Sequence, residues 1–187
     1  MPKKDMRFLC YPFMREESCM VDFEIRTDSL AARIGLAASL TESYSEVYAD
    51  LMHLVKMAYH LNGSVRGRLA ITEEDLQWLS EIYDSYLAEV RDRTEGFVLP
   101  QGCQAAAVLH TCRSEAKKSV RALHKVSLEK DVPEILFDYA NLLANVLFVM
   151  AVYMNKKQQI EEIPFVSKSY PNRKSTTRGN KHETNNL

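Results

Sequence analysis

Arg113 and Lys117 are the residues of this sequence whose types and spacing most directly suggest a chemistry. They lie four residues apart in "QAAAVLHTCRSEAKKSVRALHK", an alanine-rich segment typical of a helix, and residues three or four apart share one helix face. Two cations on one face can hold a polyphosphate, and the Arg offers two parallel donors. Two alternatives stay open: a solvated basic face, or an Arg113 that pairs with neighbours of Glu115 or with a carboxylate of another chain.

Asn141 and Asn145 form a second polar pair at helical spacing. They lie in "YANLLANVLFVMAVYMNKK", an otherwise apolar segment. If this segment is a core helix, both amides are buried, and buried amides need hydrogen-bond partners. This face is therefore a second candidate for ligand binding.

No metal site is predicted. A helical bundle can hold a pair of metal ions when two helices each carry a Glu-x-x-His motif, and the nearest match here is Asp50 with His53. The sequence also lacks the P-loop, the H-E-x-x-H zinc motif and the G-x-S-x-G turn of serine hydrolases. A catalytic triad assembled from distant residues stays open, because a sequence does not show spatial proximity.

Helical periodicity runs through most of the chain. Apolar residues recur three and four positions apart in five segments. Helix boundaries are indicated by Thr27, by Gly63, by Thr72 with Asp75 as a weaker form of capping box, and by Pro133. With no convincing interior strand, these features predict an all-α five-helix bundle. The expected helices follow Thr27 and span about 44–61, 71–92, 103–126 and 133–157.

Composition divides the chain into three parts. Residues 1–26 form an N-terminal arm, for which a short strand and an extended segment are alternatives, and residues 27–160 form the bundle. Residues 161–187 form a basic tail with almost nothing apolar to bury, so we predict that it is disordered. A solvated terminus is the simplest interpretation of this tail, and contact with nucleic acid or an acidic membrane surface is the alternative.

Charge and cysteine usage limit the expected partners. The net charge is −1, but residues 167–187 hold five Lys or Arg against one Glu, which leaves the rest of the chain at −5. An acidic body argues against a nucleic-acid partner. The four cysteines form no C-x-x-C pair and the first residues lack an apolar signal segment, so we predict a cytoplasmic protein. The longest apolar stretch contains an Asp and two Asn, so we predict a buried helix and no membrane contact.

The motifs around the two polar pairs resemble those of the PduO-type ATP:cob(I)alamin adenosyltransferases. "GFVLPQGCQAAAVLHTCR" is similar to that family's "F-x-L-P-G-G-S-x-x-A-A-x-L-H-x-A-R", and "YANLLANVLFVMAVYMNKK" to its "L-N-R-L-S-D-x-L-F-x-L-A-R-x-x-N". "VDFEIRTDSLAARIGLA" likewise follows "V-E-A-Y-G-T-V-D-E-L-N-S-x-I-G-L-A", so the resemblance covers about residues 21–158. It implies a five-helix bundle that assembles as a homotrimer with sites between subunits.

The resemblance also implies an activity. Members of this family bind ATP, with Mg²⁺, between neighbouring subunits and a reduced corrinoid such as cobalamin above it; Co(I) attacks the ribose C5′ and triphosphate leaves. By position, Phe97 is the apolar wall that removes the lower ligand of the cobalt. Asp28 and Arg113 are the pair that meets across the subunit interface, and Asn141 is a polar residue of the nucleotide site.

Several positions depart from the family pattern. Lys117 replaces a second arginine of the fourth helix, Val120 replaces a glutamate and Asn145 replaces an aspartate. Lys117 and Asn145 are still predicted to bind the nucleotide. The family's N-terminal "T-K-T-G-D-x-G-x-T" loop wraps the phosphates, but the first 26 residues here contain no glycine, and a phosphate-binding turn is hard to build without one.

Three hypotheses follow from the motifs that the sequence retains and those that it has lost. The protein is an active adenosyltransferase with a rebuilt phosphate site, a weak or inactive homologue that binds a corrinoid or a nucleotide, or a trimeric scaffold that has lost the ligands. The fold is compatible with all three. Losing charged contacts that act in a transition state costs orders of magnitude in rate, so we expect weakened catalysis.

Overall fold

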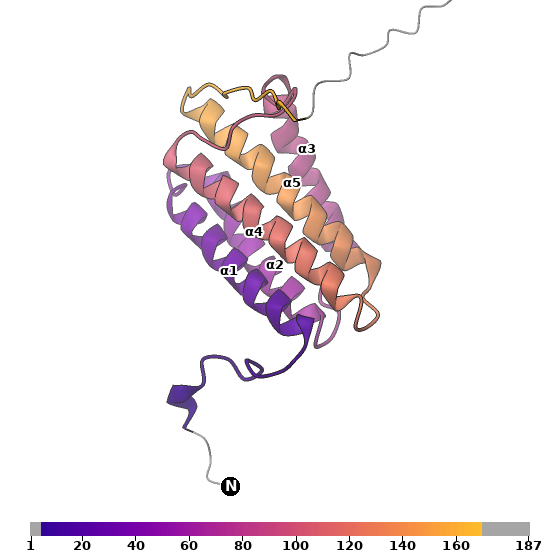
Figure 1. Ribbon diagram of the computed structural model, residues 1–187. Helices are drawn as coiled ribbons and strands as arrows, with labels where there is room; N and C mark the ends of the chain where they lie inside the picture. The colour runs from indigo at the N-terminus through magenta and orange to yellow at the C-terminus, as the bar shows by residue number, and fades with distance from the viewer. Residues whose placement is uncertain (1–4, 170–187) are drawn as a thin grey trace, which may run out of the picture.

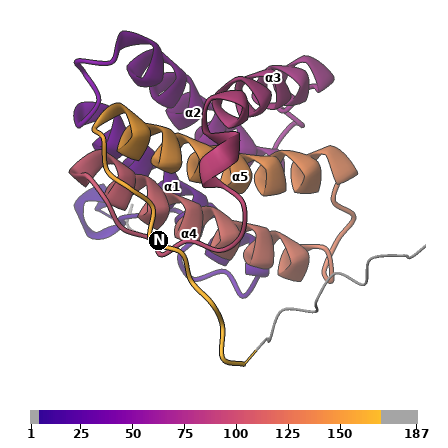
Figure 2. The same cartoon turned by 90° about the horizontal axis from the view of Figure 1, so that it is seen from above.

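Five α-helices form an all-α bundle in the computed structural model, which describes residues 5–169 (Figure 1). The fourth helix packs between the first and the fifth; the second helix packs on the first, and the third on the fifth. Seen from above, the second and third helices lie on the opposite side of the fifth helix from the fourth (Figure 2). The predicted fold class is confirmed. The helices are α1 (Cys19–Ser39), α2 (Ser45–Ser64), α3 (Glu73–Val90), α4 (Gln104–Val126) and α5 (Glu134–Lys157), with 3-10 turns at Met6–Phe8 and Arg91–Arg93.

Helix α1 begins at Cys19, nine residues before the start that Thr27 as an N-cap predicts, so the first limit predicted for the bundle was wrong. Ser18 caps the helix, and the Glu129 carboxylate accepts hydrogen bonds from the Cys19 backbone N–H at 3.0 Å and from the Ser18 hydroxyl at 2.8 Å. Thr27 lies inside the helix, where its hydroxyl donates to the Phe23 carbonyl at 2.8 Å. The Ser18 hydroxyl also accepts from the Met20 N–H at 3.2 Å, a local capping signal that the sequence analysis passed over; the Glu129 contact, 110 residues away in the sequence, reinforces it.

The other helix boundaries follow local rules. Thr72 and Asp75 form a complete capping box at the start of α3. The Cys103 sulfur accepts from the Ala106 N–H at the start of α4, whose range matches the prediction. Pro133 immediately precedes α5, a position where its missing N–H costs nothing.

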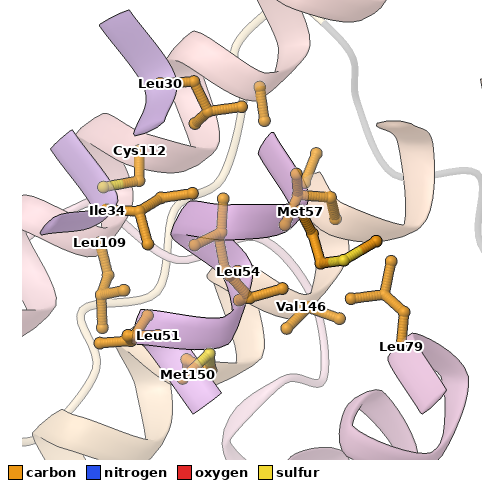
Figure 3. Packing of buried hydrophobic residues seen from close by; sticks show 14 of the residues in the cluster. Leu30, Ile34, Leu51, Leu54, Met57, Leu79, Leu109, Cys112, Val146 and Met150 are labelled. Atoms are coloured by element: carbon orange, nitrogen blue, oxygen red, sulfur yellow. The ribbon is translucent and has the colours of Figure 1, made fainter. Parts of the chain in front are cut away.

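The core is one apolar cluster to which all five helices contribute (Figure 3). Helix α5 supplies many of its buried side chains. It has the length and composition of a membrane span, but 61% of its 18-residue apolar window is buried inside the bundle. Its hydrophobicity is therefore that of a core helix. Figure 3 shows Ile34 of α1, Leu54 of α2, Leu79 of α3, Leu109 of α4 and Met150 of α5 in this cluster.

Arg66 holds the described part of the N-terminal arm against the bundle. Its guanidinium pairs with Glu24, which is only 4% exposed, at 2.7 Å and with Glu16 at 2.9 Å, and it lies 3.8 Å from the centre of the Phe13 ring. These contacts attach the arm at the start of α1, at the opposite end of the bundle from the loop before α4 (Figure 1).

Candidate functional site

A hollow of about 250 Å³ lies on the outer side of the α4–α5 pair. It brings together four of the residues that the sequence singled out: Arg113 and Lys117 from α4, and Asn141 and Asn145 from α5. Each pair is spaced by four residues and so faces one direction, and the antiparallel contact of α4 with α5 sets the pairs opposite each other. Val120 and Ala144 complete the lining.

Arg113 is fixed by an aromatic contact and has no carboxylate partner. Its guanidinium lies 5.1 Å from the centre of the Phe148 ring, within the range of a cation–π interaction. It forms no ion pair with any residue in the range 5–169. Lys117 is exposed and is likewise unpaired among these residues. The α4 side of the hollow therefore offers two uncompensated positive charges, which suits an anionic ligand.

Asn141 and Asn145 are both exposed, so the expectation of buried amides was wrong. They lie on the side of α5 that faces the outer groove, while the rest of the helix faces the core. The Asn141 amide donates to the Phe137 carbonyl of its own helix at 2.8 Å. Its oxygen and the whole Asn145 amide face a solvent-accessible hollow and can bind a polar ligand.

The hollow does not fit a metal ion held by the protein. Its lining includes no carboxylate, and no group of three or more His, Cys, Asp or Glu side chains within residues 5–169 could hold a metal. Mg²⁺ ordinarily takes one or two carboxylates together with substrate phosphates. Here only the phosphates of a ligand could supply its anionic ligands.

Phe97 lies on the loop before α4, and the residue is 78% exposed. An isolated antiparallel bridge between Val98 and Pro164, called the ribbon below, holds the loop backbone: the Phe165 N–H donates to the Phe97 carbonyl at 2.7 Å, and the Leu99 N–H donates to the Ile163 carbonyl at 2.8 Å. The segment after α5 therefore runs beside the loop before α4 (Figure 1). The limit predicted at residue 161 for a disordered tail was wrong, because residues 163–165 take part in this ribbon; residues 170–187 lie outside the described part of the chain.

The buried Asn155 amide fixes the position of this loop. Its oxygen accepts from the Cys103 N–H at 3.0 Å, and its nitrogen donates to the Gln101 carbonyl at 3.0 Å and to the Glu162 carboxylate at 2.8 Å. Gly102 has φ +131°, and a Cβ there would overlap the same amide, so only glycine fits. The sequence analysis assigned no role to Asn155, although this residue stands at the final N of the family motif that the segment resembles.

The ribbon presents an exposed apolar surface. Large apolar side chains from both of its strands are exposed, and such surfaces commonly mark binding sites. Phe165 is the second aromatic residue of this surface, and the sequence analysis did not identify it. We define the apolar end of the bundle as Phe97, Leu99, Ile163, Phe165 and Val166.

Asp28 does not meet Arg113 within one chain. It is exposed on α1, where its carboxylate accepts from the Tyr59 hydroxyl of α2 at 2.9 Å, a bond that raises the pKa of Tyr59. Arg113 faces the α4–α5 groove instead. Ile25 and Leu36, at helical spacing along the same outer face of α1, are also exposed, so Asp28 stands on a partly apolar surface.

His110 is a buried side chain one helical turn before Arg113. It is only 6% exposed, and neither ring nitrogen has a hydrogen-bond partner within residues 5–169. Burial, followed by the charge of Arg113, lowers its pKa to about 4. The imidazole is therefore neutral near pH 7 and adds no charge to the Arg113 side of the groove.

Comparison with known proteins gives consistent matches. The cobalamin adenosyltransferase family profile matches residues 13–154. The chain is 29% identical to a cobalamin adenosyltransferase of Cupriavidus metallidurans, over 69% of this chain and 71% of the relative. It is 25% identical to a corrinoid adenosyltransferase of Bacillus subtilis, over 80% and 81% of the two chains.

The fold has a counterpart among solved structures. A variant PduO-type ATP:corrinoid adenosyltransferase from Lactobacillus reuteri, in complex with cobalamin and ATP, superposes with a TM-score of 0.70 at 22% identity. The match covers 79% of this chain and 84% of that one. This likeness shows that the two proteins share a fold.

The depressed pKa of His110 predicts a loss of stability in mild acid. Since the folded-state pKa of about 4 lies below the ordinary value near 6.5, the unfolded chain takes up the proton first as pH falls. The free energy of unfolding should therefore drop by about 2 kcal/mol between pH 7 and pH 5 through this group. Denaturant unfolding should show that His110→Gln removes this part of the drop, whereas His60→Gln, at an exposed position, does not. Parallel pH profiles for wild type and His110→Gln would contradict the assignment.

Proposed function

Because the chain belongs to the cobalamin adenosyltransferase family, we propose that it transfers the adenosyl group of ATP to a reduced corrinoid. The observation that carries the proposal is the placement of two complementary surfaces along one helix. The apolar end lies beside the start of α4, and the cationic hollow with Arg113 and Lys117 lies about 15 Å further along it. The flat face of a corrin ring suits the first surface, and a nucleoside triphosphate suits the second.

The reaction needs positioning more than acid–base chemistry. The reduced cobalt supplies the electron pair that forms the bond to the ribose C5′, and the C5′–O bond breaks as triphosphate leaves. The chain must hold the two substrates in line and stabilise the negative charge on the leaving group. Arg113 and Lys117 serve the leaving group, and Asn141 and Asn145 orient the nucleotide.

Phe97 acts on the corrinoid. An exposed ring on a backbone fixed by the ribbon and by Asn155 is an apolar wall that is ready before the ligand binds. Placed against the lower face of the corrinoid, it excludes the lower ligand of the cobalt and so favours reduction of Co(II). Phe165 on the neighbouring strand extends this wall.

The side chains that line the cationic hollow support slow turnover. The hollow contains no carboxylate to order Mg²⁺ or the basic side chains, and the described part of the arm contains no glycine. The specific alternative is therefore a non-catalytic protein that binds the corrinoid or the nucleotide without transfer. A bare trimeric scaffold is less compatible with an aromatic ring that is held exposed at the apolar end.

We propose a homotrimer in which Asp28 of one subunit pairs with Arg113 of the next. Two observations support this: Arg113 has no carboxylate partner within the described part of its own chain, and Asp28 stands beside exposed Ile25 and Leu36. Association would bury that apolar face and complete the nucleotide site. All four cysteines are free thiols, which supports the cytoplasm as the compartment.

The assembly is tested by removing one charge of the proposed pair. Light scattering should give the mass of a trimer for the wild type and a smaller mass for Asp28→Asn, because leaving one member of a buried pair uncompensated costs about 3–5 kcal/mol. Tyr59→Phe is the matched control, since it removes only the intrachain hydrogen bond of Asp28. A monomeric wild type, or an unchanged Asp28→Asn assembly, would contradict the pairing.

The corrinoid site is tested by Phe97→Ala. With ATP present, cob(II)alamin bound to the wild type should show the absorption and magnetic resonance spectra of a species without its lower ligand, and Phe97→Ala should restore the ligated species. Because the residue is 78% exposed, unfolding free energy should change by less than about 1 kcal/mol, against about 3–5 kcal/mol for a packed Phe. Phe8→Ala, at an equally exposed ring in the arm, is the control. Identical spectra for wild type and Phe97→Ala would defeat the assignment.

A further inference from the structure

A groove separate from the cationic hollow lies where the last turns of α5 meet α2 and α3, on the other side of α5 from α4 (Figure 2). Its volume is about 370 Å³, which is in the range of small-molecule sites. Each of the three helices contributes a pair of side chains spaced by four residues, so the members of each pair share one face. The pairs are Glu46 and Asp50 of α2, Ser85 and Glu89 of α3, and Tyr153 and Lys157 of α5.

Two tyrosine rings line this groove. Tyr86 is buried, and its ring packs edge-on against that of Tyr153 with 4.9 Å between the ring centres. The Tyr86 hydroxyl donates to the Asp50 carboxylate at 2.7 Å, which fixes the direction of that carboxylate. An aromatic ring with carboxylate oxygens beside it combines the two kinds of group that attract an ammonium ion.

The carboxylates of the groove are only partly compensated. Glu89 pairs with Lys156 at 3.1 Å, but Glu46 and Asp50 form no ion pair with any residue in the range 5–169. Burial raises the pKa of Asp50, and the neighbouring charge of Glu46 adds to this rise. Three carboxylates stand against two ammonium groups, those of Lys156 and Lys157, which leaves one negative charge in excess.

An ammonium group of the chain itself shows how a cation is held here. The Lys157 nitrogen lies 4.9 Å from the centre of the Tyr153 ring, within the range of a cation–π interaction. Lys157 is exposed and forms no ion pair with the described part of the chain. A long exposed side chain held by this contact is easily displaced, so Lys157 stands in for the cation of a ligand.

The geometry favours an organic cation over a metal ion. Within residues 5–169, no group of three or more His, Cys, Asp or Glu side chains could hold a metal, so the three carboxylates do not converge on one point. A primary ammonium has three N–H donors that reach separate oxygens. The alkyl chain attached to it can lie against Ile82 and the two tyrosine rings.

We infer that the groove between α2, α3 and α5 binds the ammonium group of a primary aliphatic amine. The ammonium donates to the carboxylates of Glu46 and Asp50 and lies against the Tyr153 ring in place of Lys157, which moves out into solvent. One bound ammonium neutralises the excess negative charge of the groove. This amine site is separate from the cationic hollow and from the apolar end, and it does not rest on the proposed function.

Ligand-observed nuclear magnetic resonance on the full chain tests the inference with n-butylammonium chloride as the probe. Ionic strength is held constant with sodium chloride, because salt screens exposed charges. Asp50→Asn should weaken binding about fivefold or more, since it removes a carboxylate that faces the ammonium. Asp84→Asn removes the same charge from an exposed position of α3 outside the groove and should change the affinity less than about twofold.

Lys157→Met should act in the opposite direction. It removes the chain's own ammonium from the Tyr153 ring and should strengthen the binding of n-butylammonium about threefold or more. Lys56→Met is the matched control, because it removes the same charge from an exposed position of α2 outside the groove, and it should leave the affinity unchanged. Both side chains are exposed, so this comparison holds even if Asp50→Asn fails to fold.

Tetramethylammonium has the same charge but no N–H donor, and it should bind about tenfold more weakly than n-butylammonium. Three results would overturn the inference. The first is an absence of n-butylammonium binding at millimolar concentrations. The second is an equal effect of each groove variant and its control, which would indicate a diffuse acidic surface. The third is equal binding of the two ammonium ions, which would show that the carboxylates accept no hydrogen bond from the ligand.

Discussion

The buried Asn155 amide is the contact on which the geometry of the site depends. It joins the last turn of α5 to the first residues of α4 and to the segment that follows α5, through hydrogen bonds to Cys103, Gln101 and Glu162. A buried amide is stable only when such bonds are formed, so the three segments are held as a unit. Because α4 also carries Arg113, this unit sets the distance between the apolar end and the cationic hollow.

The site is polarised along α4. Its first end presents exposed aromatic and aliphatic side chains, and its middle presents Arg113 and Lys117 beside two amides. No general base or protein-held metal is needed in this arrangement, because a corrinoid nucleophile and a phosphate leaving group supply the reacting atoms. What the protein contributes is orientation and positive charge, which are catalytic when they are in place before the reaction begins.

Local patterns made part of this architecture predictable. Thr72 and Asp75 cap α3 within four residues of sequence, and the spacing of Arg113 with Lys117 and of Asn141 with Asn145 placed each pair on one face. What could not be predicted depends on partners far apart in the sequence. The loop carrying Phe97 is fixed by Asn155, and the exposure of Asn141 depends on the side of α5 that the neighbouring helices leave uncovered. The start of α1 has a local cap, Ser18, which Glu129 reinforces from 110 residues away. The family resemblance indicated how these elements are arranged relative to one another, which helical periodicity alone does not show.

The most direct measurement is the stoichiometry of products formed by the purified full chain with ATP and cob(II)alamin under a strong reductant. The account predicts that adenosylcobalamin and inorganic triphosphate appear together, one for one and slowly, because the positive charges for the leaving group are present while the carboxylates of the phosphate end are not. Bound corrinoid and bound ATP with no cobalt–carbon bond formed would contradict it. Conversion of ATP to ADP without adenosylcobalamin would contradict it equally.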